Sequence, residues 1–116
     1  MGMKEYNDKF KLDYGLYGVP EHTRESLERY LFEGIEPGGF LYSVLTNDLY
    51  GACTRCDHVN KEYLVEIVRW VFHEAPRGSW GHQACMVDWI KDRNQCRTKF
   101  VEEWERQEMW RVLNEQ

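Results

Sequence analysis

The chain has 116 residues, which fits one domain, and its 42% hydrophobic and 30% charged residues are ordinary for a chain that folds around its own core. The net charge of −5 repels phosphates and disfavours nucleic acid as a partner. No apolar run approaches the roughly 18 residues of a membrane span, and the N-terminus lacks the apolar core of a signal peptide. We therefore expect a cytoplasmic protein without a membrane partner and with four reduced cysteines.

The first part of the chain predicts an irregular arm followed by a helix. Residues 1–19 mix charged residues, tyrosines and glycines, and a lone strand there would have no partner. Pro20 suits the first turn of a helix, Leu27, Tyr30 and Leu31 share one helical face, and Gly34 suits the C-terminal cap. These features predict a helix over about 20–33.

The middle of the chain predicts two further helices. After a turn at 35–39, an apolar stripe with helical spacing predicts a helix from about Gly39. The pattern leaves open a continuation to Cys56, with Gly51 as a weak point. Asn60 is a natural N-cap for a helix over about 61–75, which Pro76 ends. The faces expected to be buried consist of Phe40, Leu41, Val44, Leu45 and Leu49 in the first helix and Leu64, Ile67, Val68, Val71 and Phe72 in the second.

The last part predicts a glycine-rich turn over 77–81 and a fourth helix that begins near Met86. Residues 91–116 favour one long helix, or two with a break near Asn94. The predicted fold is all-α: a bundle of four or five helices with an arm at 1–19, a core at 20–93 and a C-terminal extension of the same domain at 94–116. The predicted core consists of Leu27, Leu31, Phe40, Leu41, Val44, Leu45, Leu64, Ile67, Val68, Val71, Trp80 and Trp89.

The cysteines and histidines offer a possible metal site. Cys53 and Cys56 form one closely spaced pair and His82 and Cys85 another, as in zinc modules. The simpler interpretation is that these are free thiols at the end of an apolar helix, so no metal or other cofactor is expected. Cys85 with His82 or His73 could also be imagined as nucleophile and base, but four cysteines and four histidines give such pairs by chance.

Acid–base chemistry and anion binding have weaker signals. Paired carboxylates could be sought among Asp48, Asp57, Glu66 and Glu74, although ion pairing, capping and solvated helix faces explain them more simply. The two glycine turns could cradle an anion, but neither continues into the Gly-Lys-Ser/Thr of a P-loop. We expect both turns to be structural, and we expect no catalytic residues.

The C-terminal extension is the predicted partner-binding segment. It is more apolar than a lone exposed helix requires, and Trp, Met and Arg are enriched at the centres of interfaces. The alternative is that this helix folds back and closes the bundle. The predicted partner-binding residues are Arg97, Trp104, Arg106, Met109 and Trp110.

A pattern of short motifs runs from Pro20 to Ile90. It includes a PGGFL run that starts at Pro37, a VLTNDL run from Val44 to Leu49, an EAP triplet that ends at Pro76, and a final WG at Trp80 before Trp89. This pattern resembles a group of small proteins encoded by phages and prophages. Those proteins end soon after the position of Trp89, so the residues from 91 onward resemble an extension.

The resemblance implies a compact helical unit of viral origin. By analogy with small acidic phage proteins, we expect a non-enzymatic protein that binds a host or viral protein in the bacterial cytoplasm, in the specific form of an inhibitor of a bacterial defence system or host factor. A homodimer is also possible. The alternatives are a zinc-stabilised regulatory module and, after it, a small enzyme.

Overall fold

The computed structural model describes residues 14–15 and 17–114, with side chains described as far as Arg106. This part of the chain is helical and contains no strand, which confirms the all-α prediction. The helices are more numerous and shorter than predicted. They are α2 (Glu21–Glu33), α3 (Gly39–Leu45), α4 (Leu49–Arg55), α5 (His58–Glu62), α6 (Leu64–Glu74), α7 (Gln83–Ile90) and α8 (Cys96–Asn114), with the 3₁₀ turns η1 (Arg77–Ser79) and η2 (Arg93–Gln95).

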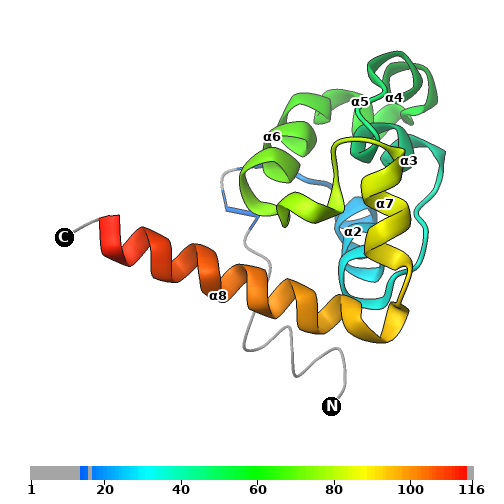
Figure 1. The fold of residues 1–116 in the computed structure, drawn as a ribbon. Coiled ribbons are helices and arrows are strands. Elements are labelled where there is room, and N and C mark those ends of the chain that lie inside the picture. Colours follow the sequence, from blue (N-terminus) through cyan, green and yellow to red (C-terminus); the bar gives the residue numbers. More distant parts are fainter. Residues whose placement is uncertain (1–13, 16, 115–116) are drawn as a thin grey trace.

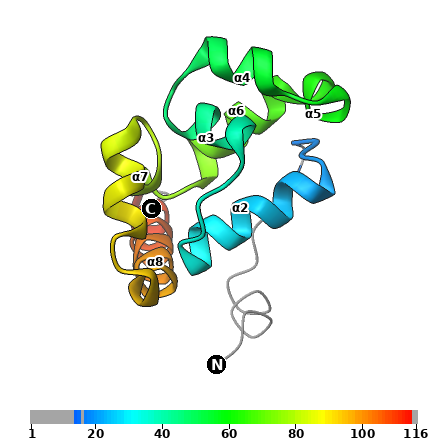
Figure 2. The same ribbon diagram turned by 90° about the vertical axis from the view of Figure 1, so that its right-hand side faces the viewer.

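Helix α2 crosses the middle of the molecule, with α3, α4, α5 and α6 on one side of it and α7 and α8 near its C-terminal end (Figures 1 and 2). Helix α8 runs along the edge of this body, and its C-terminal part extends past the other helices (Figure 1). None of the helices within the described ranges is long and apolar enough to cross a membrane.

Helix α2 forms as the sequence predicts. Pro20 is extended and precedes the first turn, and Gly34 ends the helix in the left-handed conformation at φ 68°. The Gly34 N–H donates to the Tyr30 carbonyl at 3.1 Å, which satisfies one of the last orphan acceptors of the helix. A Cβ at Gly34 would lie 3.1 Å from the Cys96 sulfur, so this glycine also allows α8 to approach.

The helix predicted from Gly39 does not continue to Cys56, because the chain breaks at Thr46–Asp48 and two helices form instead of one. Asn47 has a φ of 65°, a left-handed conformation that asparagine tolerates better than most residues. Asp48 then caps α4 by accepting a hydrogen bond from the Gly51 N–H at 2.9 Å. Gly51 is therefore required in the first turn, since a Cβ there would collide with the Asp48 carboxylate and the Ser43 hydroxyl.

The predicted helix over 61–75 is also divided. Asp57, and not Asn60, is the N-cap: its carboxylate accepts a hydrogen bond from the Asn60 N–H at 2.7 Å. Helix α5 starts there and ends at Tyr63, and α6 follows directly. Ala75 leaves the helical region before Pro76, as predicted.

Most of the predicted core is buried, but three apolar side chains assigned to buried faces are not. Leu49 is 69% exposed because it follows the helix break at Thr46–Asp48. Val68 is 45% and Phe72 55% exposed because α6 turns Ile67, Trp70 and Val71 toward the core, on its opposite side. Val44, Leu64 and Trp80 are partly buried against the core. The buried residues missing from the predicted core are Tyr14, Val19, Tyr30, Phe32, Ala52, Trp70, Ala75, Met86, Cys96 and Phe100.

The described end of the N-terminal arm packs on the body. The Tyr14 ring stacks on Trp70 of α6 with centroids 4.9 Å apart, and the Arg24 guanidinium lies over the Tyr14 ring. Arg24 also donates to the Val19 carbonyl at 2.7 Å. These contacts tie Tyr14 to α2 and α6 and Val19 to α2. The rest of the arm lies outside the described residues.

The start of α8 belongs to the core. Phe100 packs edge-on against Phe32 of α2 with centroids 4.7 Å apart, and Cys96 is fully buried. The boundary predicted at residue 93 thus divides a continuous core. Of the two alternatives for residues 91–116, the structure has the break near Asn94, where η2 separates α7 from α8.

Two substitutions in α6 test this arrangement. Trp70 is fully buried, so Trp70→Ala should lower the free energy of unfolding by about 3–5 kcal/mol through the cavity it creates. Val65→Ala, one turn away and 65% exposed, should change it by less than about 0.5 kcal/mol. Urea unfolding followed by circular dichroism measures both, and similar losses for the two variants would contradict the orientation of α6.

Candidate functional site

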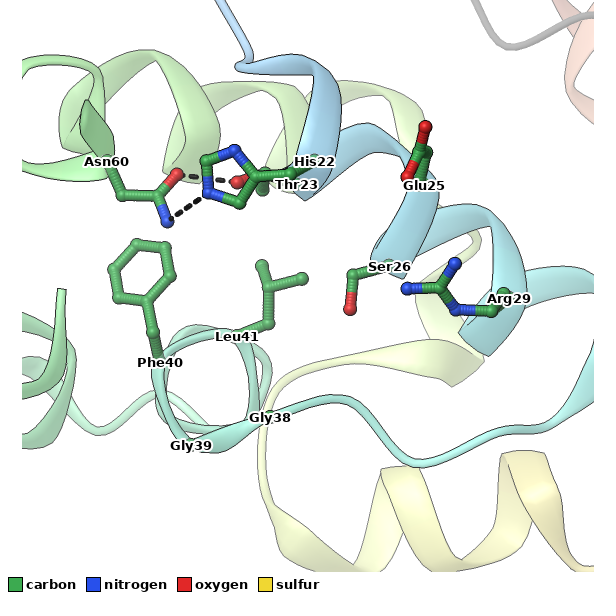
Figure 3. Close-up of a pocket in the computed structure, with 10 residues that line it drawn as sticks. All are labelled: His22, Thr23, Glu25, Ser26, Arg29, Gly38, Gly39, Phe40, Leu41 and Asn60. Atoms are coloured by element: carbon green, nitrogen blue, oxygen red, sulfur yellow. Dashed lines mark hydrogen bonds between the residues drawn. The ribbon is translucent and has the colours of Figure 1, made fainter. Parts of the chain in front are cut away.

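A pocket of about 390 Å³ lies between α2 and α3 and is closed at one end by α5. Phe40 and Leu41 extend from α3 into the space below α2 (Figure 3). Apart from these two side chains, the lining of the pocket is mainly polar, and it comes from segments far apart in the sequence. The lining residues are His22, Thr23, Glu25, Ser26, Arg29, Gly38, Gly39, Phe40, Leu41 and Asn60.

The polar side of the pocket is a row on one face of α2. His22, Ser26 and Arg29 follow the spacing i, i+4, i+7, which places them along one side of the helix. The buried face of the same helix carries Leu27 and Leu31 next to this row. Helix α2 therefore anchors the core with one face and lines the pocket with the adjacent one.

A hydrogen-bonded group closes the end of the pocket. Thr23 donates its hydroxyl proton to the Asn60 side-chain oxygen at 2.5 Å. The His22 Nε2 lies 3.3 Å from the Asn60 amide nitrogen and 3.2 Å from the Asp57 carboxylate. This nitrogen can accept from the amide when His22 is neutral, or donate to the carboxylate when it is protonated.

The pKa of the Asp57 carboxyl is lowered. The main cause is the backbone N–H of Asn60, which bonds the ionised carboxylate, and the nearby His22 adds to the effect. Tyr30, on the buried side of α2, has a pKa that is raised strongly because burial disfavours the ionised phenolate. The Tyr30 hydroxyl thus stays protonated and donates to the Ser79 carbonyl at 2.7 Å, which joins α2 to η1.

A second candidate surface is apolar and lies on the side of α6 opposite the core. We define the outer face of α6 as Val65, Val68 and Phe72, which are 65%, 45% and 55% exposed. They stand at i, i+3 and i+7, the spacing of one helical face. At its end the Phe72 ring packs against Trp80 with centroids 5.6 Å apart, so the apolar surface continues onto the segment after η1.

The four residues of the zinc alternative do not come together. Cys53 is exposed and Cys56 donates to its carbonyl oxygen at 3.3 Å, while Cys85 lies near His82 with sulfur–nitrogen distances of 3.6 and 3.8 Å. Within the described ranges no three His, Cys, Asp or Glu side chains form a group that could hold a metal ion.

The fourth cysteine is a structural residue. Cys96 is buried, its thiol donates to the Trp89 carbonyl at 3.1 Å, and burial raises its pKa. A buried, protonated thiol is a poor nucleophile.

The predicted partner-binding residues of the extension occupy different settings. Arg97 is turned inward: it lies 3.7 Å from the Glu33 carboxylate and over the Phe32 ring. Trp104 is 38% exposed, and Arg106 is exposed and pairs with Glu103 at 2.7 Å. The side chains of Met109 and Trp110 lie outside the described residues.

Comparisons of the chain with protein-family models, with curated proteins and with solved structures return no match. Function therefore has to be inferred from the residues themselves. Sequence analysis missed both the pocket and the outer face of α6. The polar row His22, Ser26 and Arg29 was a signal for the first, and the apolar residues all round 64–72 were a signal for the second.

The Asp57 cap predicts a pH-dependent contribution to stability. Because the folded pKa of Asp57 lies below the unfolded value, the carboxylate stabilises the fold above the unfolded pKa, and this is lost as the pH falls through the folded pKa. Asp57→Ala should lower the melting temperature at pH 7, and its difference from wild type should shrink in acid. Asp88→Ala, which removes an exposed carboxylate from α7, controls for the change in net charge. A difference for Asp57→Ala that stays constant from pH 7 to pH 2.5 would contradict this role.

Proposed function

We propose that this protein acts by binding another protein, of a bacterial host or of a virus, and that the outer face of α6 is the main contact surface. One observation carries the proposal: a helix that already buries one apolar face in the core carries a second apolar face on the outside. Exposed apolar area of this kind is typical of interaction sites. Phe72 provides an aromatic anchor of the type that dominates binding energy.

The extension provides a second contact. The C-terminal part of α8 extends past the body (Figure 1), and Trp104 of the same helix is partly exposed. Two surfaces that each bind weakly give a stable complex when both engage the same partner. Arg97 does not contribute to this surface directly, because its guanidinium holds α8 against α2.

The resemblance of the Pro20–Ile90 pattern to phage proteins suggests the kind of partner. A small acidic protein of that origin would act on a bacterial defence system or another host factor by occupying its surface. No cofactor or catalytic group is needed for such inhibition. This part of the proposal is analogy and is tested separately from binding.

Charge substitutions on the outer face of α6 should abolish partner binding. The tagged full-length chain is used to capture proteins from a bacterial host, and the partner that wild type retains is then titrated as a purified protein. The double variant Val68→Glu, Phe72→Glu should weaken binding at least about tenfold, because it places charges in a desolvated contact. Val87→Glu, at a 56% exposed position of α7, is the matched control and should bind like wild type.

Two further measurements separate the alternatives. Analytical ultracentrifugation of the wild-type chain shows whether the occupant of this face is a second copy. Expression in a defence-bearing host should restore phage plating with wild type and with Val87→Glu, but not with the double variant. Binding of the double variant at wild-type affinity would overturn the assignment of the surface, whereas normal binding without any effect on plating would overturn only the inhibitory role.

A further inference from the structure

Beyond the proposed protein contact, the pocket between α2 and α3 is lined by Arg29, an exposed cation without a counterion among the described residues. Arg29 stands four residues after Glu25, a spacing at which a helix allows the two to pair. No such pair forms, and among the described residues Arg29 has no ion-pair partner at all. Instead its guanidinium extends back toward Ser26, and the carboxylate of Glu25, which also lines the pocket, is turned away from Arg29 (Figure 3).

Ser26 lies one turn before Arg29 and contributes a second free donor. Its hydroxyl makes no hydrogen bond with any residue that the structure describes, although the side chain is half-buried. The guanidinium and the hydroxyl lie on the same side of α2 (Figure 3). A guanidinium presents two parallel N–H donors that match the two oxygens of a carboxylate, and a hydroxyl beside it can donate a third hydrogen bond.

The rest of the pocket limits what such an anion can be. Its volume of about 390 Å³ is too large for a bare carboxylate and lies at the lower end of small-molecule sites. The buried side chains of Phe40 and Leu41 offer an apolar wall opposite the donors (Figure 3). At the far end, His22 is already beside the Asp57 carboxylate, whose negative charge disfavours a second anionic group there.

We propose that this pocket binds a small organic monocarboxylate with a compact apolar or aromatic body. Its carboxylate bonds to Arg29 and Ser26, and its body lies against Leu41 and Phe40. The site is independent of the outer face of α6, which uses none of these residues. Its occupation would fix α3 against α2, because the ligand bridges the two helices.

Benzoate is a suitable probe for this site in the full-length protein. Titration followed by ¹H–¹⁵N NMR should give saturable shifts for the backbone amides of Gly38, Gly39 and Phe40. Arg29→Gln should weaken binding at least about tenfold, since it removes a charge-assisted pair of hydrogen bonds. Arg69→Gln removes the same charge from an exposed position of α6 and should leave the affinity unchanged.

Two more arms exclude trivial explanations. Gly38→Leu should block the pocket and leave the fold intact, because a Cβ at Gly38 meets nothing within 4 Å and its φ is −67°. Inorganic phosphate and uncharged benzamide should each bind at least about tenfold more weakly than benzoate, because one lacks the apolar body and the other the charge. The proposal is overturned if benzoate gives no saturable shifts, if Arg29→Gln or Gly38→Leu binds it like wild type, or if phosphate binds equally well.

Discussion

The burial of α2 on two of its sides is the constraint on which the other helices depend. Leu27, Tyr30 and Leu31 face the body, while Phe32 faces α8. A helix with two buried sides needs other elements packed against each side. The chain provides them from segments that lie far apart in the sequence. The Tyr30 hydroxyl, bonded to the Ser79 carbonyl, joins α2 to the connection that leads into α7. Without α8, the Phe32 side of α2 would be left in water, which explains why the extension cannot be a separate unit.

How much of the fold can be predicted from the sequence depends on whether the interactions that form each element are local. Helical periodicity and the caps at Pro20 and Gly34 depend on neighbours within a few residues, so α2 was predicted closely. The break at Asn47 depends instead on the Asp48 carboxylate, which accepts from the Gly51 N–H, and neither a glycine nor a proline marks this break or the one at Tyr63. A break shifts the phase of everything that follows, because each skipped residue rotates the next helix face by about 100°. The prediction therefore places Leu49, which follows the break at Asn47, on a buried face, whereas its side chain is 69% exposed.

The candidate sites could be predicted even less, for a related reason. A polar row such as His22, Ser26 and Arg29 looks like any solvated helix face until the position of α3 is known. Only tertiary packing places Leu41 opposite that row and leaves a space between them. The same holds for Arg97, which belongs to the segment predicted to bind a partner. Its contact with Glu33 depends on how α8 packs against α2, and no local sequence pattern contains that information.

Charge and apolar surface act over different distances in this protein, and the two candidate sites use them differently. The net charge of −5 is felt over about 8 Å at physiological ionic strength, so it influences which molecules approach. Apolar contacts are short-range interactions. The outer face of α6 therefore adds affinity only once a partner is in contact, and it does not select partners by their charge. An anion that reaches the pocket has to approach an acidic protein, and long-range attraction cannot hold it there. It is retained only by short, directed bonds, such as those that the exposed Arg29 and the half-buried Ser26 offer together with the apolar surface of Leu41.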